Sequence, residues 1–468
     1  MKMNLIAIKD KMNSFLLSVK YDNEIRIATG LALFLIASFL IGILPFFHNI
    51  RITCTIVLMI VGGVICFFEP YVGVLFVIFF YYLIASHIKY VSGIGTVRPI
   101  FYCSVFLAAF WILNMMVKRE YRWVNTGQVY IILGMTITMI LSTFNAAVSP
   151  EVSWEHNVKF FKILLFFVVF TNLTDSIKRV NLSYWTIALG CGLLSTLAVR
   201  YLVLVGRRVE FTTGSLAGSN ALAYMLVVIL PFFFYKIFSR NKLEKLMAII
   251  LFPMTFFGII ATMSRGGFIG LVGVMVLLAI RSKQKIKSLI LVGCIISAGI
   301  RFAPPSFKER METIKTYQQE GSAISRMMYW KAGIAMWRDH PLNGVGQDNF
   351  ILVVPQYVPP LKDRHQIYHT AHNTYITLLS EGGIFLLLFY LLLLLCNFKD
   401  LRVIRRKSPP EIDGVQIHNL TYAIEIGLIG GIINSIFITR SDFEPFFWIT
   451  GLIMTLKDII IKRKRMTL

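Results

Sequence analysis

Long apolar runs separated by short polar segments dominate the chain. A bilayer core about 30 Å thick needs about 20 mostly apolar residues per helix. Strong runs of that kind start near residues 27, 99, 129, 182, 217, 246, 374, 418 and 443, and shorter runs start near 52, 71, 159, 267 and 287. Each run is expected to be helical, because lipid offers no hydrogen-bond partner to an open backbone. The pattern predicts an all-α polytopic membrane protein with 12 to 14 transmembrane helices.

The polar segments divide the chain into five parts. Residues 1–26 are charged throughout and are interpreted as a cytoplasmic tail, which precedes N-terminal transmembrane helices over 27–300. Residues 301–373 are the longest stretch without a strong apolar run, and we expect them to form one large helical segment outside the membrane. C-terminal transmembrane helices follow over 374–460, and 461–468 is a basic cytoplasmic tail.

One helix is predicted within the long outer segment. Met327, Trp330, Ile334 and Trp337 recur at spacings of three, four and three, which is one helical face, and Pro341 follows its end. The structural interpretation of such a face is an amphipathic helix that rests on the outer leaflet.

Composition and charge exclude a soluble protein. Hydrophobic residues make up 56% of the chain and charged residues only 15%, against roughly 25% charged in an ordinary soluble domain. The net charge of +23 would suggest nucleic-acid binding in a soluble protein. With both termini inside, however, the inner segments hold 28 of the 47 lysines and arginines, and the short outer segments hold nine. The charge therefore follows the positive-inside rule and gives no reason to expect a nucleic-acid partner.

Arginines in two short outer loops are candidates for binding an anion. Arg207 and Arg208 precede one apolar run, and Arg265 lies in a turn between two others. An arginine at the edge of apolar helices is costly unless it pairs with something. Gly266 and Gly267 permit close backbone approach at the start of a helix, where the helix dipole favours an anion. The alternative is an interfacial arginine whose side chain reaches the membrane surface.

Histidines are concentrated in the outer segment. His340, His365, His369 and His372 lie there, but the last three lack the ligand spacing of familiar zinc motifs, so no metal site is predicted. The six cysteines all lie in apolar runs, which predicts neither disulfides nor a zinc site. His372 directly precedes an apolar run, so its imidazole is expected at the outer membrane surface. There it could accept a proton from a hydroxyl near pH 7, or simply cap a membrane helix.

The sequence resembles the O-antigen ligase and polymerase superfamily of bacterial envelope proteins. The resemblance is carried by SRMMYWKAGIAMWRDHPLNGVGQDNF, by HTAHNTYITLLSEGGIFLLLFYLL, by the SRGG turn at 264–267 and by the pattern that ends in Asn220 and Ala221. It implies a glycosyltransferase of the C-type membrane fold that needs no cofactor. Its donor would be an undecaprenyl-diphosphate-linked glycan, used at the periplasmic face of the bacterial inner membrane.

The resemblance also implies roles for particular residues. His372 takes the position of the family's general base, and Arg265 that of the second of two arginines that contact the donor diphosphate. Arg208 is favoured as the first of these arginines, with Arg207 or Arg200 as alternatives. Arg326, Arg338 and His340 match the recurrent motif and are expected to be structural or to contact the donor. His369, from the second motif, is a further possible site residue.

Several functions remain open at this point. A ligase that uses a lipid A-core hydroxyl as acceptor is favoured over a repeat-unit polymerase or a protein O-oligosaccharyltransferase, which share the same donor chemistry. A transporter for a lipid-linked anionic glycan would show paired repeats and broken helices at the bilayer midplane, whereas the polar features here gather at one surface. A non-catalytic scaffold leaves the arginines and the histidine unexplained.

Overall fold

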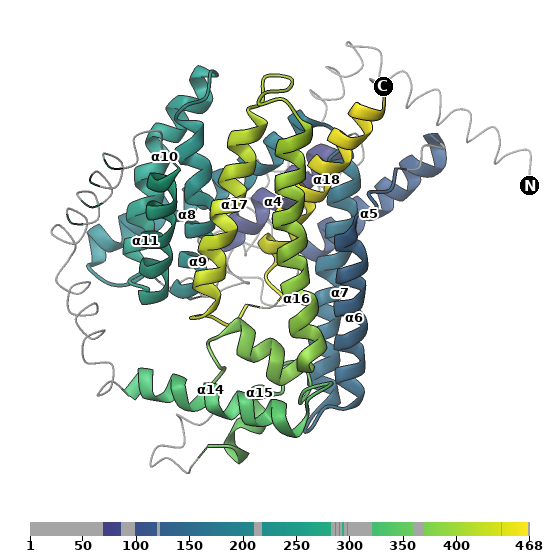
Figure 1. Ribbon diagram of the computed structural model, residues 1–468, viewed down its shortest axis with the longest axis vertical. Helices are drawn as coiled ribbons and strands as arrows, with labels where there is room; N and C mark the ends of the chain where they lie inside the picture. The colour runs from purple at the N-terminus through teal and green to yellow at the C-terminus, as the bar shows by residue number, and fades with distance from the viewer. Residues whose placement is uncertain are drawn as a thin grey trace, which may run out of the picture. The chain divides into compact units, whose positions relative to one another are not determined.

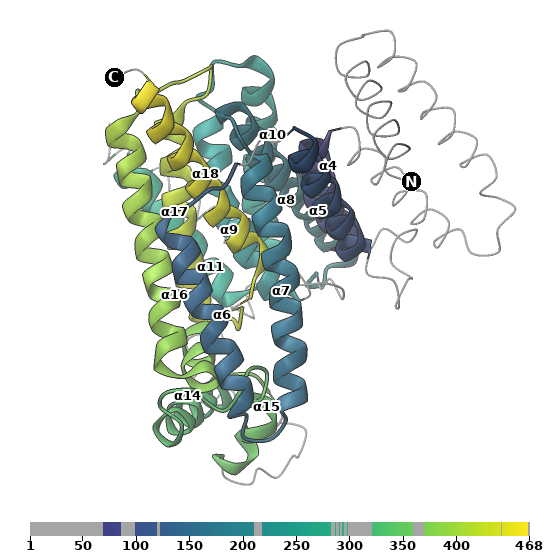
Figure 2. The same cartoon turned by 90° about the vertical axis from the view of Figure 1, so that its right-hand side faces the viewer.

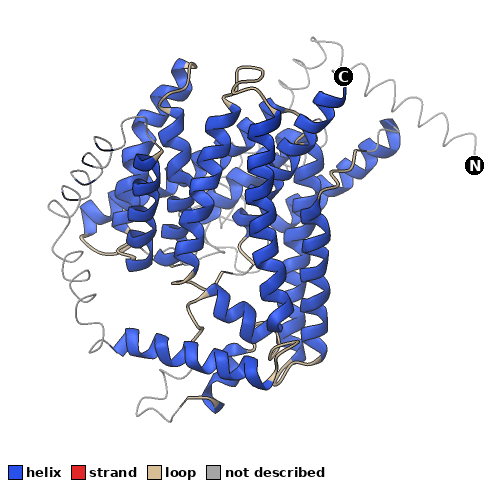
Figure 3. Cartoon of the chain, in the orientation of Figure 1, coloured by secondary structure: helices blue, strands red, loops and turns tan. Residues whose placement is uncertain are grey.

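The computed structural model describes most of the chain after residue 68. The described residues are 69–85, 99–118, 122–209, 218–281, 321–358, 369–440 and 442–466, with isolated positions at 286, 290, 293 and 297. All regular elements in them are helices, apart from an isolated bridge between Ile412 and Val415 (Figures 1 and 3). The all-α prediction is confirmed. The chain divides into two compact units, residues 1–122 and 123–468.

In the first unit, the described residues form two helices. These are α4 (Pro70–Ala85) and α5 (Pro99–Lys118). Both begin with proline, which suits the first helical position because its missing N–H has no partner there anyway. The tail over 1–26 and the apolar runs near 27 and 52 lie outside the described residues.

The second unit is a bundle of long apolar helices. Among the described residues, six helices are long and apolar enough to cross a membrane, namely α6 to α10 and α16, and the protein is therefore polytopic. The predicted total of 12 to 14 stays a prediction, because several of the runs lie outside the described residues. The helices are α6 (Gly127–Phe144), α7 (Pro150–Leu173), α8 (Ile177–Val205), α9 (Ser219–Lys236), α10 (Lys242–Ala261), α11 (Arg265–Ile280), α14 (Gly321–Asp339), α15 (Phe350–Val353), α16 (Thr374–Lys407), α17 (Ile417–Ser435) and α18 (Glu444–Met466), with a short 3₁₀ helix, η2 (Val354–Gln356), after α15.

Helix α9 forms the centre of this unit. It packs against α8, α10, α11 and α17, and nearly all of its side chains are buried. A Cβ on Gly427 of α17 would collide with the carbonyl oxygen of Val228 in α9. Glycine at this position therefore lets the two helices approach closely.

Helix α7 begins earlier than the apolar pattern suggests. The apolar run starts near 159, but the helix starts at Pro150, where the Ser149 hydroxyl accepts from the Val152 N–H at 3.3 Å. One face of its polar first turns is buried against residues 347–349, since the Ser153 hydroxyl donates to the Gln347 carbonyl at 2.9 Å. Figure 2 shows α6 and α7 extending together toward α15.

The two long sequence motifs form one joint between α14 and α16. The N–H groups of Val345 and Gly346 donate to the carbonyls of Ser380 and Glu381, at 2.8 and 3.1 Å. Helix α16 is kinked at Gly383, whose φ of +70° suits glycine, and a Cβ there would collide with the Leu342 carbonyl. The joint attaches α14 to α16, and α14 lies across the lower end of the bundle in Figure 1.

Helix α14 packs against the bundle with a face other than the apolar stripe seen in the sequence. Its existence and its end before Pro341 agree with the prediction. The buried face, however, carries Tyr329, Ala332 and Met336, whereas Met327 is 51% exposed. The reason is close packing, because a Cβ on Gly333 would lie 2.5 Å from Cγ2 of Ile376 in α16. The small residues therefore determine which face meets the bundle.

Candidate functional site

Helices α9 and α11 begin at the end of the bundle that α14 crosses (Figure 1). A cavity of about 220 Å³ opens there. Its walls come from six separate parts of the chain: the segment after α8, the start of α9, the start of α11, α14, the segment before α16 and the segment after α17. The residues that line it are Arg208, Asn220, Arg265, Gly266, Arg326, His372 and Phe437.

The start of α11 places Arg265 and Gly266 at the cavity. Ser264 caps the helix, with its hydroxyl accepting from the Gly267 N–H at 3.1 Å. A Cβ on Gly266 would lie 2.7 Å from Cβ of Phe437, and one on Gly267 would lie 2.5 Å from Cβ of Ala223. The two glycines therefore bring α11 against α9 and the segment after α17, which closes this side of the cavity.

The start of α16 fixes the segment that follows α17. The Thr374 hydroxyl donates to the Ile438 carbonyl at 2.7 Å and accepts from the Arg440 N–H at 3.1 Å. The Thr377 hydroxyl lies 3.2 Å from that of Thr439. These contacts hold Phe437 at the cavity wall and Arg440 close to His372.

His372 is kept neutral by its surroundings. Burial lowers the pKa of His372, and electrostatic interactions with Arg326, His369 and Arg440 lower it further, to about 4. At neutral pH the imidazole is therefore uncharged and can accept a proton. The described residues that line the cavity carry three guanidinium groups and no carboxylate, which makes the site suited to an anion.

The structure brings together four of the predicted site residues, namely Arg208, Arg265, Arg326 and His372. His369 is exposed and lies beside the ring of Tyr329, without lining the cavity. The remaining candidates are exposed and are not among the cavity residues: Arg200, Arg207, Arg338 and His340. His365 lies outside the described residues.

Two residues at the site were not predicted from the sequence as site residues. Phe437 lines the cavity, and Arg440 is near enough to act on the charge of His372. Arg440 did carry a signal, because it is one of the few arginines in the short segments that the sequence analysis assigns to the outer side. Phe437 carried none, since its contact with Gly266 depends on how α11 and α17 pack.

No ready metal site appears in the part of the chain that the structure describes. Groups of three or more histidine, cysteine, aspartate or glutamate side chains placed to hold a metal ion are absent from those residues. The positive charge at the cavity is supplied by guanidinium groups.

Comparison with protein families identifies the region around this cavity. Residues 246–391 match the family model of the O-antigen ligases. This stretch is an O-antigen ligase domain. The resemblance seen in the sequence is thereby confirmed, and the family is one of glycan transferases of the O-antigen ligase and polymerase type. The domain includes Arg265, Arg326 and His372, whereas Arg208 and Phe437 lie outside the matched residues. No curated protein matches the chain.

Proposed function

We propose that this protein transfers a glycan from an undecaprenyl-diphosphate donor to an acceptor hydroxyl, with His372 as general base. The observation that carries the proposal is the convergence of Arg208, Arg265, Arg326 and His372 on one cavity inside a membrane bundle. The O-antigen ligase domain supports the same reaction class.

The arginines of the cavity bind the diphosphate. A guanidinium group stays charged and matches phosphate oxygens in a bidentate geometry, so it stabilises a departing diphosphate without a metal ion. The cavity of about 220 Å³ is smaller than the roughly 300 Å³ at which pockets for drug-sized ligands begin. It therefore holds the diphosphate head, while the glycan and the polyprenyl chain extend out of it.

The reaction is a single displacement. The acceptor oxygen forms a bond to the anomeric carbon of the donor glycan, and the bond from that carbon to the diphosphate oxygen breaks. His372 takes the proton of the acceptor hydroxyl, and the diphosphate leaves with the electron pair. One displacement inverts the configuration at the anomeric carbon.

Donor binding activates the base. The pKa of His372 is lowered to about 4 by burial and by nearby positive charges, Arg326 foremost among them. A diphosphate bound to the arginines offsets that positive field and raises the pKa of His372 toward neutrality. A base whose pKa lies near the operating pH transfers protons most effectively, so His372 becomes competent when the donor is present.

The cavity faces the periplasm, and both termini lie in the cytoplasm of a bacterial inner membrane. Support comes from the opposite end of the bundle, where the helix ends around the α9–α10 and α16–α17 connections are rich in lysine and arginine. These residues are Lys236, Arg240, Lys242, Lys245, Lys399, Arg402, Arg405, Arg406 and Lys407. Such segments remain on the cytoplasmic side. Lipid A-core is the proposed acceptor.

A transfer assay tests the proposal. Purified protein receives a polyprenyl-diphosphate-linked oligosaccharide, no added metal, and one of three acceptors: lipid A-core, a Ser/Thr-rich protein or a second donor molecule. Product on lipid A-core supports a ligase, and product on the other acceptors indicates protein glycosylation or polymerisation. His372→Ala should lower the rate by roughly 10²-fold or more, the usual range for a general base.

His418→Gln is the matched control, because His418 lies at the far end of the bundle, where its ring contacts the Ser408 carbonyl. It should retain transfer. Full transfer by correctly inserted His372→Ala contradicts the proposal. Donor crossing the bilayer of proteoliposomes without any glycan transfer would instead establish a transporter.

A further inference from the structure

Helix α14 holds the backbone next to His372. The indole N–H of Trp330 donates to the Ala371 carbonyl at 2.9 Å. Ala371 is fully buried and belongs to the same apolar cluster as Tyr329 and Met336 of α14. The peptide group between Ala371 and His372 is therefore fixed from the α14 side.

Helix α16 holds the other side of His372. The Asn373 carboxamide oxygen accepts from the N–H groups of Tyr375 and Ile376, at 3.0 and 3.2 Å. Between these two restraints, His372 has a φ of +48°. This left-handed conformation is unfavourable for a residue other than glycine, so neighbouring contacts must enforce it, and such strain gathers at functional sites. The Trp330 bond is one of the contacts that enforce it.

The same helix also supplies an arginine to the cavity. Arg326 lies four residues before Trp330, and residues at that spacing share one helical face. Arg326 lines the cavity, while Trp330 reaches the backbone that carries the imidazole. We propose that Trp330 is a positioning residue for His372. Through it, α14 fixes the position of the imidazole relative to Arg326, which the same helix contributes to the cavity. The inference rests on the proposed function, since it takes His372 as the base.

The chain offers a matched control on the same helix. Trp337 lies seven residues after Trp330 and is also partly buried, but its indole nitrogen has no hydrogen-bond partner among the described residues. A change from tryptophan to phenylalanine removes the same atoms at both positions. A hydrogen bond is lost only in Trp330→Phe.

Kinetics in two backgrounds separate positioning from general stability. Trp330→Phe should lower kcat about tenfold or more, because small misplacements of a reacting group cost one to two orders of magnitude. The KM for the polyprenyl-diphosphate-linked oligosaccharide should change less than about twofold, since the arginine contacts remain. Trp337→Phe should behave like the unmodified protein. On a His372→Ala background, Trp330→Phe should have almost no further effect, because residues that act as a unit are not additive.

A chemical readout needs no acceptor. Diethyl pyrocarbonate modifies accessible neutral imidazoles, and mass spectrometry of the peptide that contains His372 gives the rate. Trp330→Phe should raise this rate several-fold, and Trp337→Phe should leave it unchanged. Equal rates in the two variants, or an undiminished Trp330→Phe effect on the His372→Ala background, would overturn the inference. Full transfer by His372→Ala refutes the proposed function itself. If His372→Ala abolishes transfer but Trp330→Phe transfers at the unmodified rate, only the role of Trp330 is refuted.

Discussion

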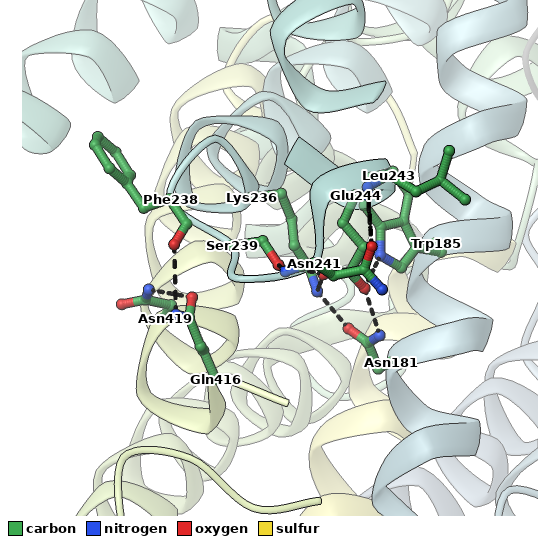
Figure 4. A network of polar contacts seen from close by, with 10 residues as sticks. All are labelled: Asn181, Trp185, Lys236, Phe238, Ser239, Asn241, Leu243, Glu244, Gln416 and Asn419. Atoms are coloured by element: carbon green, nitrogen blue, oxygen red, sulfur yellow. Dashed lines mark hydrogen bonds and ion pairs between the residues drawn. The ribbon is translucent and has the colours of Figure 1, made fainter. Parts of the chain in front are cut away.

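At one end of the 123–468 unit, charged side chains fill the space between helices; at the other, they border an open cavity. Lys236 Nζ lies 2.9 Å from Glu244 Oε2 and donates to the Asn181 side-chain oxygen Oδ1 at 2.7 Å. Trp185 Nε1 donates to Glu244 Oε1 at 2.8 Å (Figure 4). The adjoining space is about 10 Å³, about what a single water requires. The charges at this end therefore bind α8, α9 and α10 to one another.

A second cluster at the filled end has the same character. The Glu425 carboxylate lies 2.9 Å from Arg281 and 3.0 Å from Arg405, and both guanidinium groups pack on the ring of Tyr422. Arginines here join the ends of α11, α16 and α17. At the cavity end, arginines from α11 and α14 face about 220 Å³ of open space instead. The type of a charged residue therefore does not reveal its role, whereas the volume of the space beside its side chain does.

The largest expected effect is on transfer, at the cavity end. Arg265→Gln removes the charge and the bidentate donors but keeps a polar side chain of similar length. Loss of a group that stabilises charge in the transition state lowers kcat by roughly 10²- to 10³-fold. The thermal unfolding midpoint in detergent should stay within a few degrees. Transfer by the correctly inserted variant at more than a tenth of the original rate would show that Arg265 does not stabilise the transition state, and would contradict the contrast between the two ends.

The next effect concerns stability, at the filled end. Glu244→Gln leaves the largely buried Lys236 ammonium without its anionic partner, and breaking such a pair costs on the order of 3 kcal/mol. We expect a markedly lower unfolding midpoint, with transfer per folded molecule unchanged. Adding Lys236→Met should recover part of the midpoint, since no buried charge is then left. If Glu244→Gln instead abolishes transfer in folded protein, the two ends are coupled and the contrast between them is wrong.

A third test compares two arginines on the same helix. Arg326 lines the cavity, while Arg338, twelve residues later on α14, is exposed and does not. Arg326→Gln should raise the donor KM about tenfold or more, because a hydrogen bond to a charged group contributes about 1.5–3 kcal/mol. Arg338→Gln should change it less than about twofold. A rise of equal size in both variants would show that general positive charge near the membrane attracts the donor.

The apolar runs predicted much of the fold. Runs near 99, 129, 374, 418 and 443 correspond to α5, α6, α16, α17 and α18, because long helices in lipid have few alternatives. The start of α7 could not be predicted in this way, since its first turns are polar and packed against the segment at 347–349. The buried face of α14 was equally hidden, as it depends on Gly333 meeting Ile376.

Part of the candidate site could also be predicted. Arg265 and Arg208 contradict the positive-inside trend, and His372 precedes a membrane helix, so each carried a local signal. Arg326 and Arg338 both match the recurrent motif, so the sequence does not distinguish them. Only their positions along α14 determine which of the two lines the cavity. Trp330 gave no sign of its contact with Ala371, because that bond joins residues 41 positions apart.

The smallest expected effect is a difference in pH dependence. A general base must be unprotonated, so the rate falls as the pH drops through its pKa. The profile of kcat/KM reports the free enzyme, in which the pKa of His372 is lowered to about 4, and its acid limb should lie near that value. The profile of kcat reports the donor complex, where bound diphosphate offsets the charges of Arg326 and Arg440, so its acid limb should lie at higher pH, by about one unit or more. Arg440→Gln should move the kcat/KM limb upward, because one positive charge that disfavours the imidazolium is gone. If the acid limbs of the kcat/KM and kcat profiles coincide near pH 6.5, the cavity arginines do not act on the pKa of His372. The charges at the open end would then have no more effect on ligand chemistry than those at the filled end.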